Sequence, residues 1–313
     1  MKAFGPVPSR RLGRSLGVNN IPPKYCTYSC IYCQIGRTAN LIADRGAFYK
    51  PDDVVDDVMR LVEEVSRRGE RIDYLTFVPD GEPTLDLNLG HEIECLKPLG
   101  IPIAVLTNGS LLWMEDVRRD LLKADWVSLK VDAASEEVWR RINRPHGSLS
   151  LEEIWEGMRL FAAEFEGTLA TETMMVKDVN DDEDELEAIA SFLAELQPDV
   201  AYIAVPTRPP AERWVEPASE EALNAAYQIF SELLSHVELL IGFEGEEFAY
   251  SGDVERDILS ITSVHPMRED ALRALLRRAG ADWSLVERLI EAERLRVVEY
   301  KGGRFYLRHL GSR

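Results

Sequence analysis

The chain alternates short apolar runs with amphipathic helical segments, and this alternation constrains the fold more than any other feature. Strands with two apolar faces are typical of a parallel sheet that is covered by helices. With a first strand near Leu16–Asn20, the pattern gives six or seven β/α units, which is too few for a complete eight-fold barrel. We therefore predict an α/β fold with a partial, open (β/α)6-type barrel. The other expected strands are Ile72–Val78, Ile103–Thr107, Trp126–Val131, Leu169–Val176, Val200–Val205 and Val237–Ile241, and the expected helices are Pro51–Arg68, Leu87–Leu96, Leu112–Leu122, Leu151–Phe165, Glu183–Leu196 and Ser219–Leu234.

After Gly252 the pattern changes to three short helices and a hairpin. The helices are expected near Val254–Ser263, Arg268–Ala279 and Trp283–Ala292, and residues 297–307 alternate apolar and polar about a Gly-Gly turn. Because this is the element order of a winged helix, we predict a barrel over residues 1–250 and a winged-helix-like domain over 251–313. Winged helices often bind DNA, but the third helix carries charges of both signs, so protein docking or capping of the barrel are equally open roles.

Cysteine usage and hydropathy indicate the compartment. Three of the four cysteines lie within eight residues, and in a reducing cytosol such a group indicates a metal before a disulfide. No uncharged apolar run reaches the ~18 residues of a membrane span, and the first residues lack the apolar stretch of a secretory signal. We therefore predict a cytoplasmic protein with no membrane partner.

The net charge of −19 is unevenly distributed along the chain. Residues 1–50 carry eight Lys and Arg against one acid, so an anion bound near the cysteines is predicted more readily than a broad polyphosphate-binding face. The alternative is that these cations pair with surface acids or with helix ends. Loop cations that could meet an anionic substrate are Arg10, Arg11, Arg14, Arg144, His146 and Arg208.

Cys26, Cys30 and Cys33 follow Pro22 and Pro23 at a spacing that brings three thiolates around one centre. Closed structural zinc needs four ligands, whereas three cysteines can hold a four-iron cluster with one iron left open for chemistry. Zinc completed by Cys95 or by a histidine is the alternative. Cys95 itself lies in a helical pattern, where we expect a buried, small apolar side chain.

Strand periodicity predicts a polar interior for the barrel. Side chains alternate along residues 126–132, so Ser128, Lys130 and Asp132 share one face, while the other face is apolar. Buried charges must be paired or functional, so Lys130 and Asp132 are candidates for cofactor or substrate contact, with a mutual salt bridge as the alternative. Asn108, at the end of another strand, and Glu172 point to the same cavity.

These motifs resemble the radical S-adenosylmethionine (SAM) superfamily. Its cluster motif matches the three cysteines with Tyr32 before the last, and its Gly-Glu motif resembles residues 77–84, although Asp80 stands where a glycine is more usual. Residues 4–17, 106–110 and 130–133 further resemble the subgroup related to wyosine-base (tRNA-modifying) synthases. That subgroup carries a second set of cysteines ahead of the first, whereas no cysteine precedes Cys26.

The resemblance implies an enzyme that holds a [4Fe-4S] cluster and S-adenosyl-L-methionine, cleaves the latter reductively, and uses the 5′-deoxyadenosyl radical to modify a substrate. It implies an electron donor such as flavodoxin or ferredoxin, and a tRNA base as substrate, with a peptide or a small molecule as the alternative. Glu82 is the expected partner of the cofactor ammonium, with Gly81 allowing close backbone approach. The cofactor set is completed by Tyr32, Asp80, Asn108, Lys130, Asp132 and Glu172.

A second hypothesis comes from another class of protein. The cluster could serve only as a redox sensor in a regulator whose winged helix binds DNA. The Glu82 turn and the polar strand face are hard to explain under that hypothesis. No Ser-His-Asp arrangement, phosphate-binding glycine loop or His-Glu-x-x-His motif supports a hydrolase.

Overall fold

The computed structural model describes residues 2–78, 80–240, 252–264, 266–300 and 302–309. Its centre is an eight-stranded sheet in the order β1-β2-β5-β6-β7-β8-β9-β10. β1 pairs with β2 in antiparallel fashion, and every other neighbouring pair is parallel. These strands are β1 (Ala3–Ser9), β2 (Gly13–Val18), β5 (Tyr74–Phe77), β6 (Ile103–Thr107), β7 (Trp126–Lys130), β8 (Thr168–Met174), β9 (Val200–Ala204) and β10 (Val237–Leu240). The predicted α/β fold with a mostly parallel sheet is confirmed.

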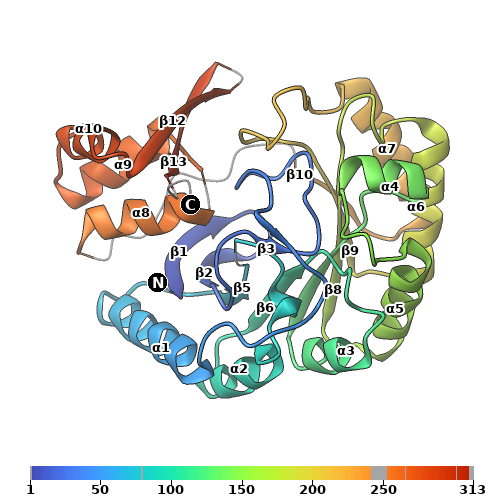
Figure 1. The fold of residues 1–313 in the computed structure, drawn as a ribbon, viewed down its shortest axis with the longest axis horizontal. Helices are drawn as coiled ribbons and strands as arrows, with labels where there is room; N and C mark the ends of the chain where they lie inside the picture. Colours follow the sequence, from blue (N-terminus) through green and yellow to red (C-terminus); the bar gives the residue numbers. More distant parts are fainter. Residues whose placement is uncertain (1, 79, 241–251, 265, 301, 310–313) are drawn as a thin grey trace.

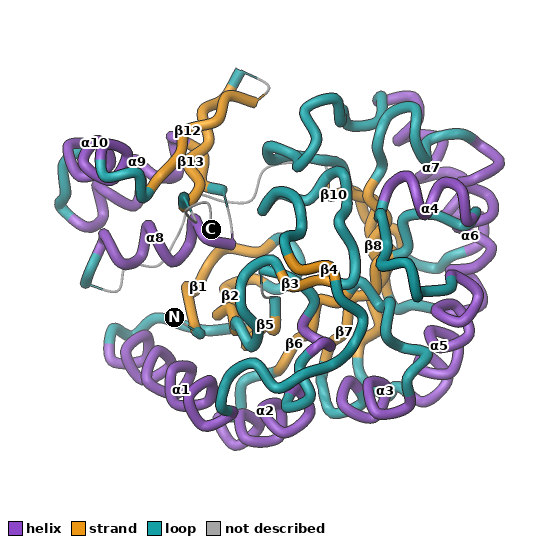
Figure 2. Tube along the Cα trace, in the orientation of Figure 1, coloured by secondary structure: helices purple, strands orange, loops and turns teal. Residues whose placement is uncertain are grey.

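The sheet curves, and helices surround its outer side, as Figure 1 shows. Figure 2 separates these helices from the loops that fill the middle of the view. The helices are α1 (Pro51–Arg67), α2 (Leu89–Leu96), α3 (Glu115–Leu121), α4 (Glu136–Ile142), α5 (Leu151–Glu164), α6 (Glu183–Leu196) and α7 (Glu220–Leu233). Side chains of Ser150, Asp182 and Ser219 accept a backbone N–H at the start of α5, α6 and α7, which accounts for where these helices begin. None of the helices in the described ranges has the length and apolar character that crossing a membrane requires.

The strand β1 and the helix α4 were not predicted. β1 lies at the edge of the sheet and contains Pro6 and Pro8, which lack a backbone N–H and so remove the usual strand signal. The helix α4 is only two turns long and follows β7 directly, and the first strand runs over Gly13–Val18 rather than Leu16–Asn20. Ile241 and the predicted domain boundary at residue 250 lie outside the described residues.

The C-terminal unit, residues 252–309 as far as they are described, has its own core. It consists of α8 (Val254–Val264), β11 (Met267–Arg268), α9 (Glu269–Ala279), α10 (Ser284–Glu291), β12 (Leu295–Tyr300) and β13 (Gly303–Arg308), with the sheet order β11-β13-β12. Buried Ile258, Leu272, Leu275 and Val286 form the centre of that core. The three helices and the hairpin agree with the prediction; β11 was missed because two residues carry no periodicity.

The C-terminal unit packs on the β1 edge of the large sheet. α8 lies against β1, and Val7 of β1 packs on the C-terminal core (Figure 1). The Tyr300 hydroxyl donates a hydrogen bond of 3.0 Å to the carbonyl oxygen of Pro206, in the loop after β9. Covering an edge strand hides its unpaired backbone groups from other chains.

Glu92 on α2 carries a testable feature of the core. Its side chain is fully buried, and neither carboxylate oxygen has a hydrogen-bond partner among the described residues. Burial, together with the nearby Asp86 carboxyl, raises the pKa of Glu92 from 4.5 to about 9. The folded protein therefore keeps a proton that the unfolded chain releases between these two values, so the free energy of unfolding falls as the pH rises through this range.

We expect Glu92→Gln to remove this pH dependence. The decline in wild-type stability, at most about 1.4 kcal/mol per pH unit from this group, should be largely absent in the variant. Urea unfolding at several pH values between 6 and 9 measures it. Glu94→Gln, an exposed position on the same helix, is the matched control. Parallel wild-type and Glu92→Gln curves would show that Glu92 does not titrate in this way.

Candidate functional site

The three cysteines of the motif line one cavity. Cys26 ends the short strand β3 (Tyr25–Cys26), which pairs with β4 (Asn40–Leu41), and the other two lie in the loop between these strands. Backbone bonds from Cys33 N to Cys30 O and from Gly36 N to Cys33 O, each 3.1 Å, hold this cysteine loop (residues 26–36) in tight turns. The thiol cavity, of about 170 Å³, is lined by Lys24, Cys26, Tyr28, Cys30, Cys33, Gln34, Ile35, Gly36, Thr38, Val78, Asp80 and Gly81.

The thiols are free and chemically suited to a soft metal group. Burial raises the pKa of all three, that of Cys30 to about 12, so each would lose a proton only on binding a metal. Amide donors already point at the sulfurs: Asn108 Nδ2 lies 3.6 Å from Cys26 Sγ, and Asn143 Nδ2 lies 3.5 Å from Cys30 Sγ. Among the described residues, no group of three or more His, Cys, Asp or Glu side chains is spaced to hold a single metal ion.

Cys95 lies apart from the thiol cavity. It is on α2, and its sulfur is 3.6 Å from Nε2 of His91, one turn earlier. The prediction of a buried Cys95 is wrong: the side chain is partly exposed, because it sits beside exposed Glu94 at the border of the buried helix face. Neither Cys95 nor a histidine is among the residues that line the thiol cavity.

The turn after β5 presents two carboxylates in different states. Glu82 is 1% exposed and already accepts hydrogen bonds from the hydroxyls of Thr84 and Thr107, each at 2.6 Å, and from Asn108 N at 2.8 Å. Asp80 is 2% exposed, yet neither of its carboxylate oxygens has a partner among the described residues. Burial raises the pKa of Asp80 to about 7, against the opposing fields of Arg308 and Lys24.

This arrangement differs from the sequence expectation for Glu82. Its carboxylate accepts a hydrogen bond from Thr107 and so ties the turn to β6. Glu82 does not line the thiol cavity, whereas Asp80 and Gly81 do. The unsatisfied carboxylate available to a ligand is therefore Asp80.

Gly81 is required by a close backbone approach. A Cβ atom at this position would lie 1.8 Å from the carbonyl oxygen of Tyr25, beside Cys26. We expect Gly81→Ala to displace β3 and to lower the free energy of unfolding by about 1–3 kcal/mol, as overpacking does. Urea unfolding measures the change. Gly147→Ala, where no atom lies within 4 Å, is the control, and equal stability of the two variants would contradict the expectation.

A charged group occupies the inner face of the barrel. Lys130 Nζ lies 2.9 Å from Glu172 Oε1 and 3.4 Å from Asp132 Oδ1, and Arg11 also pairs with Glu172. Burial would raise the pKa of Glu172, but Arg11 and Lys130 outweigh it and lower that pKa to about 2. On the opposite face of β7, Val127 and Leu129 belong to the hydrophobic core, so the predicted alternation is confirmed.

Asp132 connects this charged group to the cysteine loop. Its carboxylate accepts hydrogen bonds from the Tyr32 hydroxyl, from Asn143 Nδ2 at 2.8 Å and from Met174 N at 2.9 Å. The mutual pairing of Lys130 and Asp132 is therefore present, and Asp132 in addition orients Tyr32. Asn143 was missed by the sequence reasoning, although it follows α4 in an Asn-Arg-Pro turn.

A second cavity, of about 280 Å³, lies inside the barrel. This barrel cavity shares Cys33, Gln34 and Val78 with the thiol cavity. Of the predicted residues, it is lined by Arg10, Arg11, Tyr32, Lys130, Glu172 and Arg208. Gln34, directly after the last cysteine, was not predicted.

Three predicted substrate cations lie elsewhere. Arg14 pairs with Glu70 at the surface, and Arg144 Nη1 lies 2.5 Å from Glu212 Oε1. His146 Nδ1 lies 2.8 Å from the hydroxyl of Ser148. The contacts of Arg14 and Arg144 agree with the alternative that these cations pair with acids. His146 contacts a serine of the loop between α4 and α5, and this contact does not cap a helix.

Sequence comparison decides the family. The profile of the Radical SAM superfamily matches residues 20–193, which include the three cysteines and the Asp80–Glu82 turn. The chain belongs to the radical SAM superfamily. It is an enzyme of the radical SAM class. Enzymes of this class use a [4Fe-4S] cluster and SAM, and they need a reductant. The three thiols and the adjoining polar cavity fit both groups by their donor chemistry.

One relative of this radical SAM protein matches nearly its whole length, and others match a part of it. A UPF0026 protein of Methanocaldococcus jannaschii is 47% identical over 313 residues, which is 99% of this chain and 97% of that protein. A radical SAM methyltransferase from Sphaerobacter thermophilus has a TM-score of 0.52 at 15% identity, over 72% of this chain and 66% of that one. SuiB of Streptococcus suis, solved with SAM, has a TM-score of 0.52 at 14% identity, over 71% of this chain and 49% of that one. At these identities the two structures show a shared fold.

Proposed function

We propose that this protein cleaves SAM reductively at a [4Fe-4S] cluster held by Cys26, Cys30 and Cys33, and uses the resulting radical to modify a substrate. The observation that carries the proposal is the adjacency of the two cavities: the cavity lined by the three thiols meets the polar chamber of the barrel at Cys33, Gln34 and Val78. A cofactor bound in the chamber would therefore lie next to the cysteine-bound group.

The chemistry that a reduced [4Fe-4S] cluster supplies when bound is one-electron cleavage of SAM to methionine and a 5′-deoxyadenosyl radical. This chain contributes three thiolates for the metal, while Asn108 and Asn143 donate hydrogen bonds to two of the sulfurs. Hydrogen bonds of this kind favour the charged thiolate over the thiol.

We assign the contact with the SAM amino group to Asp80 rather than to Glu82. Asp80 is the buried carboxylate at the thiol cavity whose oxygens accept no hydrogen bond from the part of the chain that the structure describes, and Gly81 allows close approach of the backbone there. Glu82 and Asn108 position this turn, and Asp132 positions Tyr32. Lys130, Glu172 and Arg11 line the barrel cavity, where they would meet the carboxylate and the ribose of SAM.

For the substrate we propose an RNA base, with a peptide or a small molecule as the alternative. Arg10 and Arg208 line the barrel cavity, where they would meet an anionic group of the substrate, and Arg11, assigned above to SAM, lies beside them. A flavodoxin or a ferredoxin is the proposed electron donor. We further propose residues 1–250 and 251–313 as two domains, the second a winged-helix-like domain, since its element order α8-β11-α9-α10-β12-β13 supports that assignment.

Anaerobic reconstitution tests the proposal. The protein is loaded with iron and sulfide, reduced with dithionite and incubated with SAM, and 5′-deoxyadenosine is quantified by mass spectrometry. We expect iron and sulfide in equal amounts and release of 5′-deoxyadenosine. Stoichiometric zinc without inorganic sulfide, or bound iron with no cleavage of SAM, would contradict the proposal.

A further inference from the structure

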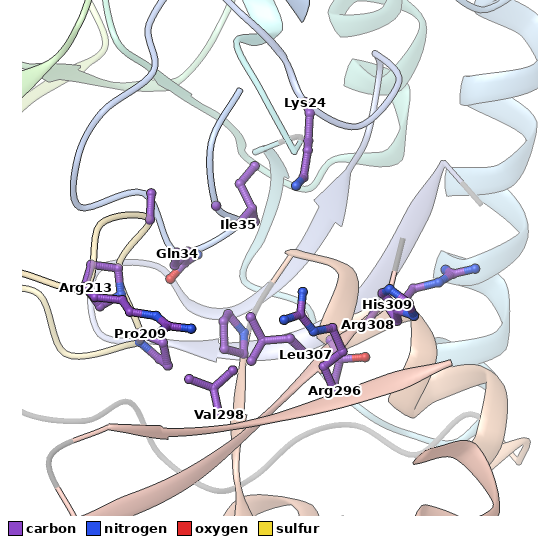
Figure 3. Close-up of a pocket in the computed structure, with 15 residues that line it drawn as sticks. Lys24, Gln34, Ile35, Pro209, Arg213, Arg296, Val298, Leu307, Arg308 and His309 are labelled. Carbon is purple, nitrogen blue, oxygen red and sulfur yellow. The ribbon is translucent and has the colours of Figure 1, made fainter. Parts of the chain in front are cut away.

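A third cavity lies where the C-terminal unit meets the cysteine loop. This junction cavity has a volume of about 320 Å³, at the lower end of the range for small-molecule sites. Its charged side chains come from three segments: Lys24 from the start of the cysteine region, Arg213 from the loop after β9, and Arg296 and Arg308 from the strands β12 and β13. Thr262 of α8 and Pro266 complete the lining on the side of the C-terminal unit. In Figure 3, Lys24 and Arg213 reach into it from two different sides.

The lining of the junction cavity is cationic. Lys24, Arg213, Arg296, Arg308 and His309 line it, and no aspartate or glutamate is among the lining residues, although the whole chain has a net charge of −19. Many arginines elsewhere in the described structure have acidic partners, as Arg45 has in Asp116 and Asp120, although some, such as Arg118, donate only to carbonyl oxygens.

Among the described residues, no carboxylate lies within ion-pairing distance of the lysine and the three arginines that line the junction cavity. Within residues 2–78, 80–240, 252–264, 266–300 and 302–309, Lys24, Arg213 and Arg296 form no ion pair, and Arg308 donates only to the carbonyl oxygen of Leu259, at 3.4 Å. Asp80 lies close enough to feel the fields of Lys24 and Arg308, but it does not line the junction cavity. Like charges that line one cavity repel each other, and an anion that enters the cavity relieves this repulsion.

We propose that the junction cavity binds a phosphate group of the substrate. Three guanidinium groups offer the paired N–H donors that match phosphate oxygens, and a phosphate can neutralise more than one of the converging cations, which a single carboxylate cannot. A concave site of this size suits one phosphate or a diphosphate better than the flat face of a folded protein. Nucleotides and RNA backbones both carry this group.

The position of the cavity explains why such an anchor would act on the proposed reaction. The junction cavity shares Lys24, Gln34, Ile35 and Gly36 with the thiol cavity but only Gln34 with the barrel cavity. A phosphate held here lies outside the barrel chamber while the rest of the substrate reaches past the cysteine loop. The C-terminal unit supplies Arg296 and Arg308, so it takes part in substrate binding. This role as a substrate anchor rests on the proposed function.

Calorimetric titration with inorganic pyrophosphate at low salt tests the proposal on the full chain, without SAM or reductant. We expect Arg296→Gln and Arg308→Gln each to weaken pyrophosphate binding about tenfold, the effect of one lost charge-assisted hydrogen bond. Arg304→Gln is the matched control, because Arg304 lies on the same strand as Arg308 but is not among the lining residues and is paired with Glu269. The control should bind pyrophosphate like the wild type.

Two competitors then distinguish the source of the phosphate. Displacement of pyrophosphate by a mononucleotide assigns the site to a free nucleotide, and displacement by tRNA alone assigns it to an RNA backbone; both outcomes support the proposal. Absence of pyrophosphate binding, or an Arg304→Gln effect as large as that of Arg308→Gln, would overturn it. The proposal would also be overturned if Arg296→Gln and Arg308→Gln bound pyrophosphate like the wild type and only slowed reduction of the protein by an acidic protein donor.

The titration needs no SAM cleavage, and the release of 5′-deoxyadenosine with dithionite needs no phosphate. The anchor and the proposed function can therefore fail separately.

Discussion

Replacement of Cys30 by serine is expected to leave the protein folded but unable to hold a [4Fe-4S] cluster. A serine hydroxyl is neither a soft ligand nor deprotonated near neutral pH, so one iron would lose its protein ligand. The loss of cluster binding should exceed about 10–100-fold, which is the usual cost of removing a residue that only hydrogen-bonds to a metal ligand. Iron and sulfide content, visible absorbance and 5′-deoxyadenosine release measure it after anaerobic reconstitution.

The fourth cysteine provides the matched control for this experiment. Cys95 lies on α2, away from the thiol cavity, so Cys95→Ser should bind iron and sulfide and cleave SAM like the wild type. Far-ultraviolet circular dichroism of both variants checks that the fold is kept. Retention of iron and sulfide by Cys30→Ser, or their loss from Cys95→Ser, would show that the ligand set is a different one.

Replacement of Asp80 by asparagine is expected to weaken SAM binding while the cluster remains. Asparagine keeps the size of the side chain but removes the negative charge, and loss of a hydrogen bond to a charged group costs roughly 1.5–3 kcal/mol, or about tenfold to a hundredfold in Kd. Equilibrium binding of SAM to the reconstituted, oxidised protein measures this, because no turnover occurs without a reductant. Iron content should equal that of the wild type.

The pH dependence separates this role of Asp80 from a merely structural one. Because burial raises the pKa of Asp80 to about 7, the carboxylate that accepts from the amino group forms as the pH rises through 7, and binding tightens in the same direction. For Asp80→Asn, the pH dependence of SAM binding reflects only the titration of SAM itself. The difference between the wild-type and variant binding curves therefore gives the contribution of Asp80.

Stability should change in the opposite direction to affinity. Without ligand, the folded state loses stability as the pH rises from about 3.8 to about 7, because over this range it keeps a proton that the unfolded chain releases. The loss is nearly complete at about pH 8, where Asp80→Asn should therefore be the more stable protein. A variant that binds SAM with the affinity and the pH profile of the wild type would contradict the assignment. A variant that both unfolds more easily and binds less would indicate damage to the fold instead.

The elements of the barrel were predictable where local patterns suffice. β6 begins and ends where its apolar run does, at Ile103 and Thr107, because a strand buried on both faces leaves a continuous apolar signal. β1 was not predictable, because its prolines interrupt the sequence pattern of a strand and because only its pairing with β2 makes it part of the sheet. The helix α4 is short, so its periodicity is weak.

The site was predictable in part, and Glu82 shows the limit. Sequence reasoning selected the turn after β5, but it could not tell which of two carboxylates is already satisfied. That depends on Thr107, which belongs to another strand and donates to Glu82, while Asp80 receives no such bond among the described residues. Which of the two carboxylates is left to bind a ligand therefore depends on how β6 packs on β5.

The amino-acid sequence by itself determined the fold class and the grouping of the three cysteines around one cavity. Both depend on short-range spacing: apolar runs of strand length, and thiols a few residues apart. Only the tertiary structure decided that Asp80 has no hydrogen-bond partner for its carboxylate among the described residues, and that Lys24 and Arg308 line the same cationic cavity. The reason is physical: hydrogen-bond satisfaction and charge compensation depend on groups that are distant in sequence and are brought together by packing alone.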